Sequence, residues 1–91
     1  MHAVVTQVSI QSGHEAESEE HVQSNVLPRV KQAPGHIAGY WIALQGGKGT
    51  AITIWETEEA ARAAVEMAQN APRPDAVTFD SMEVGEVFAQ T

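Results

Sequence analysis

Three side chains near the amino terminus have the types and the spacing of a metal-binding set. His14, Glu17 and His21 stand at positions i, i+3 and i+7, so an α-helix would bring them to one side. Two imidazoles and one carboxylate can bind a metal ion. On the same helical wheel, however, this side lies well away from the apolar positions Val22 and Val26. A solvated polar face explains the pattern better, and we expect no bound metal.

Most other patterns that carry chemistry are missing from the sequence. There is no cysteine, so a disulfide framework and a thiolate nucleophile are both excluded. The segment Gly46-Gly47-Lys48-Gly49 lacks the spacing of a phosphate-binding loop, and it joins two predicted strands rather than a strand and a helix. The sequence contains no G-x-S-x-G element and no dinucleotide-binding fingerprint.

The charge balance argues against partners that carry phosphate. The 91 residues include five Lys and Arg against twelve Asp and Glu, a formal net charge of −7. Because the basic residues are scattered among acids, they cannot form a stripe for nucleic acid or for an anionic membrane surface. We find neither a signal peptide nor an apolar run long enough to span a bilayer, and expect a cytoplasmic protein.

The elements that must position the remaining reactive residues follow a β-α-β-β-α-β order. Runs rich in β-branched and aromatic residues at 3–10, 37–44 and 49–56 predict three strands, the last two joined as a hairpin. Residues 77–89 contain the last strand or strands, with an interruption expected at Gly85.

Two helices lie between these strands. The first is predicted over 13–32 with Ser12 as its N-cap, and Pro28 predicts a kink or a break near Asn25-Val26. The second begins after the N-cap Thr57 and ends before Pro72. This order predicts one domain over residues 1–91 of the α+β class, with a ferredoxin-like fold in which both helices cover one face of an antiparallel sheet.

The predicted strands are apolar on both faces. In the second strand Trp41 points one way and Tyr40 the other, and in the third Ile54 is opposed by Trp55. Since two helices can cover only one face, the other would expose a large apolar patch that soluble monomers rarely tolerate. We therefore expect a homodimer formed through the open face of the sheet.

Two segments carry a family resemblance. Residues 34–40 read Pro-Gly-His-Ile-Ala-Gly-Tyr, and residues 51–60 run through Ile-Trp-Glu-Thr-Glu-Glu into a helix. Both resemble the antibiotic biosynthesis monooxygenase-like domains of the dimeric α/β-barrel superfamily, which implies the same fold. His36 departs from the pattern, because the family usually has phenylalanine or another bulky apolar residue there.

The resemblance implies two kinds of activity. Some members of this family are cofactor-free monooxygenases of polyketide phenols and anthrones, and others degrade heme. The heme-degrading branch uses an asparagine in the first strand, a tryptophan in the second helix and a histidine shortly after it. The comparable places here hold Thr6 or Gln7, Ala64 and residues near Pro74. None of them match, so heme degradation is disfavoured.

Cofactor-free oxygenation needs an electron-rich substrate held in a dry pocket beside a group that takes its proton. This implies a small aromatic or polyketide-type substrate and no cofactor. The alternative is a non-catalytic dimeric module that binds a small ligand or is purely structural, because a small core also needs aromatic bulk for packing. The candidate catalytic residues are His36 and Trp55, and the candidate substrate-binding residues are Tyr40, Trp41, Asn25 and His21.

Overall fold

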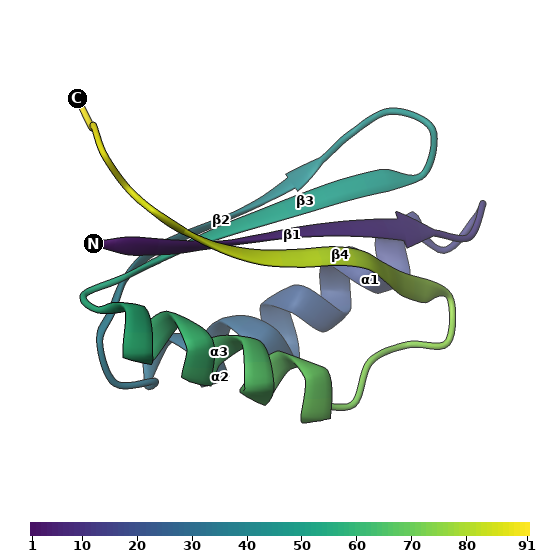
Figure 1. Cartoon of the computed structure of the whole chain (residues 1–91). Coiled ribbons are helices and arrows are strands. Elements are labelled where there is room, and N and C mark those ends of the chain that lie inside the picture. Colours follow the sequence, from purple (N-terminus) through teal and green to yellow (C-terminus); the bar gives the residue numbers. More distant parts are fainter.

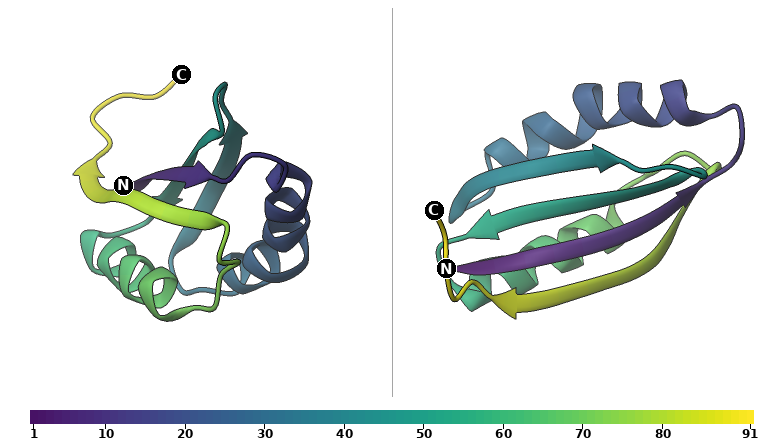
Figure 2. Two further views of the ribbon diagram at one scale, coloured as in Figure 1. Left: turned by 90° about the vertical axis from the view of Figure 1, so that its right-hand side faces the viewer. Right: turned by 90° about the horizontal axis from the view of Figure 1, so that it is seen from above.

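A computed structural model describes all residues, 1–91, and its sheet has the strand order β2-β3-β1-β4 with every neighbouring pair antiparallel. The helical segments all lie on one face of this sheet, and the other face is open (Figures 1 and 2). This is the predicted ferredoxin-like layout. The elements are β1 (His2–Ile10), α1 (Glu15–His21), η1 (Val22–Val26), α2 (Leu27–Lys31), β2 (His36–Ala43), β3 (Lys48–Trp55), α3 (Glu58–Asn70) and β4 (Val77–Glu86).

The first helical segment changes its pitch where a break was predicted. Residues 22–26 form a π-helical turn between α1 and α2, directly before Pro28 in the first turn of α2. Proline cannot donate a backbone hydrogen bond and its ring crowds the preceding turn, so a widened turn relieves the conflict. The predicted N-cap Ser12 is wrong. His14 occupies that position without a side-chain cap, and the Gly13 N–H donates to Glu15 Oε1 instead.

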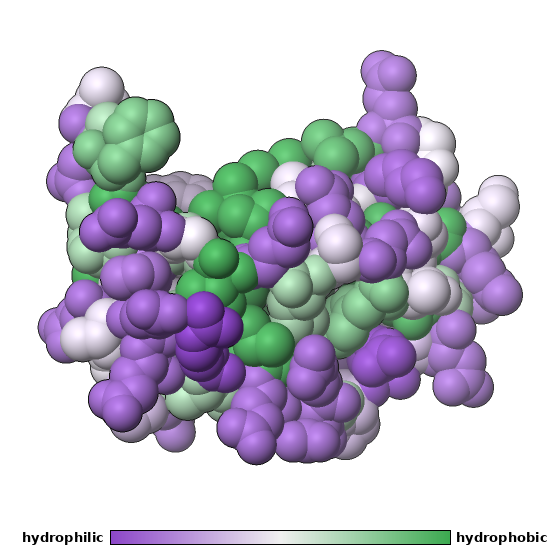
Figure 3. Space-filling view, in the orientation of Figure 1, coloured by the Kyte–Doolittle hydropathy of each residue, from purple (hydrophilic) through white to green (hydrophobic).

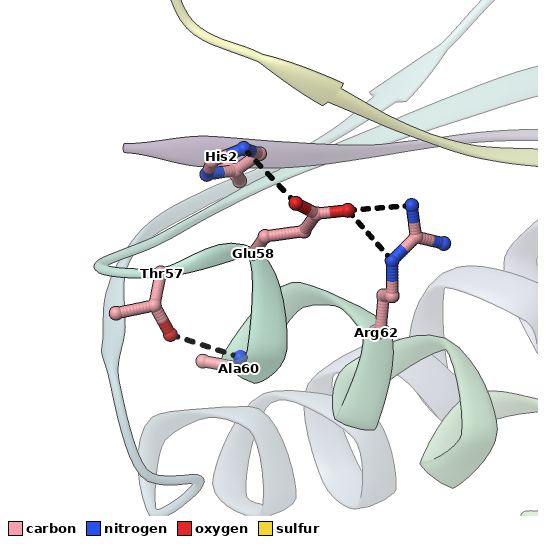
Figure 4. A network of polar contacts seen from close by, with 5 residues as sticks. All are labelled: His2, Thr57, Glu58, Ala60 and Arg62. Atoms are coloured by element: carbon pink, nitrogen blue, oxygen red, sulfur yellow. Dashed lines mark hydrogen bonds and ion pairs between the residues drawn. The ribbon is translucent and has the colours of Figure 1, made fainter.

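The helix α3 has the boundaries that its capping residues predict. The Thr57 hydroxyl accepts a hydrogen bond from the Ala60 N–H at 3.0 Å (Figure 4). This satisfies one of the amide groups that the first helical turn leaves without a partner. The helix ends at Asn70, two residues before Pro72. No helix in the chain is both long enough and apolar enough to cross a membrane.

The last strand is continuous where an interruption was predicted. β4 runs through Gly85, which pairs with Ala3 of β1, so the break expected at Gly85 is wrong. The irregularity lies further toward the start of β4, where Ser81 pairs with Gln7 and Phe79 with Val8. Asp80 is thus the extra residue of a β-bulge, and bulges are typical of edge strands such as this one.

The core between the sheet and the helices is small and is built around one tryptophan. Five buried residues form it: Val4, Val30, Trp55, Ala61 and Ala64. Trp55 is only 1% exposed and is the largest fully buried side chain. Because four of the five residues are small or medium in size, Trp55 supplies much of the apolar volume that the helices cover.

The open face of the sheet is apolar, as the two-sided strands predicted. The strand register places Tyr40, Ile52 and Val5 side by side on this face, and Tyr40 is 60% exposed. Ile42, on the same face of β2, is 41% exposed. Figure 3 shows apolar side chains along the upper rim of the molecule, between the C-terminal tail and the β2–β3 hairpin.

Candidate functional site

A groove opens between the first half of α3 and the turn that joins α2 to β2. Its volume is about 430 Å³. The turn provides one edge, the end of β3 provides the floor, and the alanine-rich side of α3 provides the opposite wall. The lining residues are Ala33, Pro34, Gly35, Trp55, Glu56, Thr57, Glu59, Ala60, Ala63, Ala64 and Met67.

The Pro34-Gly35 turn is held tightly against α3. Gly35 has a φ of 82°, which favours glycine, and a Cβ atom there would lie 2.8 Å from the Cβ of Ala60. The Gly35 carbonyl accepts a hydrogen bond from the Glu56 N–H at 2.8 Å. These contacts fix the distance between the turn and the helix. The Pro34-Gly35 pair, which is part of the family motif, therefore sets the width of the groove at this edge.

The floor of the groove is the buried indole of Trp55. Its Nε1–H donates to the Thr53 hydroxyl at 2.8 Å, so the one polar group of the indole already has a partner. Because the side chain is only 1% exposed, it offers a ligand almost no contact surface, and its bonded N–H is not available as a hydrogen-bond donor. Its predicted catalytic role remains a prediction, whereas its packing role is evident from its burial.

The wall formed by α3 explains why the groove is open. Ala60, Ala63 and Ala64 face it, and Met67 closes one end. Alanine side chains project only one carbon from the helix, so they leave space that larger residues would fill. The sequence contained this signal as a stripe of small residues, but close helix packing would have explained the stripe equally well.

Two histidines flank Trp55 on the helix-covered face of the sheet. His36 pairs with Trp55 across β2 and β3, and the two rings meet edge to face with centroids 5.2 Å apart. His2 pairs with Trp55 from the other side, across β1 and β3. In both histidines Nδ1 is buried and has no hydrogen-bond partner. His36 lies behind the floor of the groove and is not one of its lining residues.

His2 was missed by the sequence analysis. Its Nε2 lies 4.0 Å from Glu58 Oε1, and Glu58 also accepts hydrogen bonds from Arg62 (Figure 4). The hydrogen bonds and the charge of Arg62 hold the pKa of the Glu58 carboxyl below its ordinary value of 4.5. Only the register of β1 against β3 brings His2 beside Trp55, and no local motif in the sequence encodes that register.

The two predicted aromatic residues of β2 lie on opposite faces of the sheet. Trp41 points toward the helices, packs against the core, and lies so close to Gly39 that a Cβ there would be 2.8 Å from its ring. Tyr40 points to the open face. A pocket between the sheet and the helices therefore cannot contain Tyr40, and its substrate-binding role stays a prediction that the groove does not support.

The predicted polar residues of the first helix lie outside the groove. His21 Nδ1 is 3.2 Å from Asn25 Nδ2, and neither residue lines the groove. His14 Nδ1 contacts Glu17 Oε2 at 3.5 Å. The alternative of a metal set made of His14, Glu17 and His21 is not supported, because no group of three or more potential metal-binding side chains comes together in the chain.

Comparisons with known proteins bear on the fold and the family of this chain. No curated protein matches the chain. Among solved structures, the heme degrader MhuD from Mycobacterium tuberculosis, with two hemes bound in its active site, is 19% identical with a TM-score of 0.77, over 100% of this chain and 99% of that chain. The protein NE2512 of unknown function from Nitrosomonas europaea is 18% identical with a TM-score of 0.70, over 99% and 91% of the two chains.

At these identities the two neighbours establish the fold alone. The family itself follows from the sequence profile of antibiotic biosynthesis monooxygenases, which matches residues 1–70. This range includes β1, the first helical segment, the β2–β3 hairpin, the Pro34-Gly35 turn and the whole of α3. Every element around the groove lies inside the matched range. Because the match covers residues 1–70, which is most of the chain, the chain belongs to the antibiotic biosynthesis monooxygenase family.

Proposed function

We propose that this chain is a monooxygenase-like protein that binds a small aromatic molecule in the groove between α3 and the Pro34-Gly35 turn. The observation that carries the proposal is the groove itself, with its volume of about 430 Å³ and its apolar floor. Sites for small molecules are mostly apolar clefts of roughly this size with a few polar groups. Met67 and the alanines of α3 give the groove apolar contacts of the kind that a small aromatic molecule can use.

The reaction that we propose for this groove is the cofactor-free oxygenation of a phenolic compound, as in the monooxygenases of the family. A methylene group between phenolic rings can lose a proton and pass electrons to O₂, which converts CH₂ and O₂ into C=O and H₂O without an external reductant. Glu56 and Glu59 are the free polar side chains at the groove, and they can accept hydrogen bonds from phenolic hydroxyls.

The proposed proton acceptor is His36, whose Nδ1 has no partner. His36 packs against the ring of Trp55 and lies outside the lining, so proton transfer to it requires the Trp55 side chain to move when the substrate binds. His36→Gln should therefore lower oxygen uptake by about 100-fold, the lower end of the usual contribution of a general base, while ligand affinity stays nearly constant. If this variant took up oxygen at the same rate as the original protein, a residue other than His36 would be the proton acceptor.

We also propose that the protein is a homodimer in which a second copy covers the open face. Tyr40, Ile42 and Ile52 lie on that face, and no element of the chain covers them. The C-terminal segment rises past the same face (Figure 1), and it carries Phe88, which is 97% exposed. Burying such residues against a second copy would add the apolar contact that the small core lacks.

A non-catalytic ligand-binding module is the second candidate function. It is favoured by two observations: the groove lining contains no histidine, and the indole N–H of Trp55 is already bonded. Two assays distinguish these functions. One measures binding of an anthrone by thermal shift, and the other measures oxygen uptake with the same compound. Binding with uptake supports the oxygenase, and binding without uptake supports the module.

The position of the site is tested with a variant that fills the groove. Ala63→Leu adds three carbon atoms at an exposed position of the α3 wall, where leucine is nearly as good a helix former as alanine. Ala16→Leu on α1 is the matched control, because it makes the same change at an exposed helical position outside the groove. Loss of the thermal shift in the Ala63 variant alone is expected. A shift that survives in both variants would refute this site.

A further inference from the structure

The charges at the groove restrict the ligand that it can accept. Eleven residues line it, and its charged side chains are Glu56 and Glu59, with no lysine, arginine or histidine among them. Neither carboxylate takes part in an ion pair. The neighbouring Glu58 differs, because Arg62 neutralises it. The groove thus carries two uncompensated negative charges at its edge.

The positive charge of the helix terminus that meets the groove is too small to cancel them. The amino-terminal end of α3 meets the groove at Thr57, and a helix N-terminus carries about half of a positive charge. One of the free N–H groups at that end already has a partner, because the Thr57 hydroxyl accepts a hydrogen bond from the Ala60 N–H. Two full negative charges against about half of a positive one leave a negative potential, and the net charge of −7 for the whole chain has the same sign.

We infer that the groove selects aromatic ligands that are cationic or neutral and discriminates against those that carry a carboxylate. This inference rests on the proposed binding function and specifies the chemical class of its ligand. An amine or a hydroxyl group donates hydrogen bonds to Glu56 and Glu59, whereas a carboxylate meets like charge and finds no cation. Heme, with two propionate groups, belongs to the disfavoured class.

The test uses three probes that share one ring system. They are 1-naphthylmethylamine, 1-naphthylmethanol and 1-naphthoic acid, and binding is measured by titration calorimetry at low salt and again at 0.5 M salt. The amine is expected to bind about tenfold more tightly than the acid, with the alcohol between them, since two partly exposed charges each contribute modestly. The ratio should shrink at high salt, because salt screens exposed charges.

A pair of matched double variants separates the groove charges from the overall charge. Glu56→Gln with Glu59→Gln removes two negative charges at the groove, and Glu19→Gln with Glu20→Gln removes two exposed negative charges on α1, outside it. The groove variant should bring the amine-to-acid ratio close to one, and the remote variant should preserve it. Equal ratios in the two variants would overturn the inference, as would an acid that binds the original protein as tightly as the amine.

The failure of the inference can be told apart from the failure of the proposed function. If the neutral alcohol binds the original protein and Ala63→Leu abolishes this binding, the groove is a binding site. The ratio of amine affinity to acid affinity then tests only the charge selectivity of that site. If none of the three probes binds, or if Ala63→Leu leaves binding of the alcohol unchanged, the proposed function fails and the charge selectivity fails with it.

Discussion

Replacement of Trp55 by alanine should remove a large part of the stability of this fold. The change deletes the largest fully buried side chain from a core of five residues. Truncation of a buried Trp to Ala typically costs about 3 to 5 kcal/mol, from lost apolar burial and from the cavity that remains. The Thr53 hydroxyl, which is buried, also loses its indole donor, and an unsatisfied buried polar group adds about 1 kcal/mol or more.

We therefore expect Trp55→Ala to lower the free energy of unfolding by about 4 to 6 kcal/mol, in a domain whose total is about 5 to 15 kcal/mol. Urea unfolding followed by circular dichroism measures this loss, at one fixed protein concentration because association would add to the apparent stability. With a urea slope of about 1 to 2 kcal/mol per M, the midpoint should fall by at least about 2 M.

Two variants keep this prediction testable even if Trp55→Ala does not fold. Trp55→Phe keeps one aromatic ring but removes the N–H that bonds Thr53, and should cost about 1 to 2 kcal/mol. Trp41→Ala removes a tryptophan that is only partly buried, and should cost about half as much as Trp55→Ala. If Trp55→Ala were no more destabilising than Trp41→Ala, the account of Trp55 as the centre of the core would be refuted.

The remaining predictions concern the open face, the turn and the ion pair. Tyr40→Asp places a charge on the open face and should convert the dimer to a monomer at micromolar concentration in analytical ultracentrifugation; a wild-type monomer would contradict the proposed dimer. Gly35→Ala should cost about 2 to 3 kcal/mol in urea unfolding, because a Cβ there would lie 2.8 Å from α3, whereas Gly46→Ala, with a similar positive φ but open space, should cost only about 1 kcal/mol. Arg62 lowers the pKa of Glu58, so the pair should stabilise the protein above the ordinary carboxyl pKa, and this stabilisation should be lost as the pH falls through the lowered value. An NMR titration should show the midpoint of Glu58 below 4.5 and its return toward 4.5 in Arg62→Gln, and an unchanged midpoint would assign the shift to another cause.

Local signals in the sequence predicted the helix boundaries well where a single residue determines where a helix begins or ends. Thr57 caps α3 because its hydroxyl can reach an amide three residues on, and Pro72 limits the helix because proline cannot continue it. The break near Pro28 was also predicted, although its form as a π-helical turn was not. Gly85 and Ser12 were misread, because each was judged by its residue type alone and pairing or local hydrogen bonding decided the outcome.

The candidate site could be predicted only in part, because it depends on register and on three-dimensional packing. Trp55 was identified from the segment that leads into α3, and its position at the floor of the groove is consistent with that emphasis. Tyr40 was predicted to bind substrate, but the alternation of β2 directs it to the open face, away from the groove. His2 and Glu59 were not singled out, because only the folded chain brings one beside Trp55 and the other to the groove.

The binding of an aromatic molecule in the groove is tested most directly by an NMR titration of the isotope-labelled protein with an anthrone. The amide signals of Gly35, Ala60, Ala63 and Ala64 and the indole signal of Trp55 should shift together along one saturable curve, since these residues surround the groove. Shifts confined to Tyr40 and its neighbours on the open face, or no shifts at any residue, would contradict the proposed site and leave the groove without a ligand-binding role.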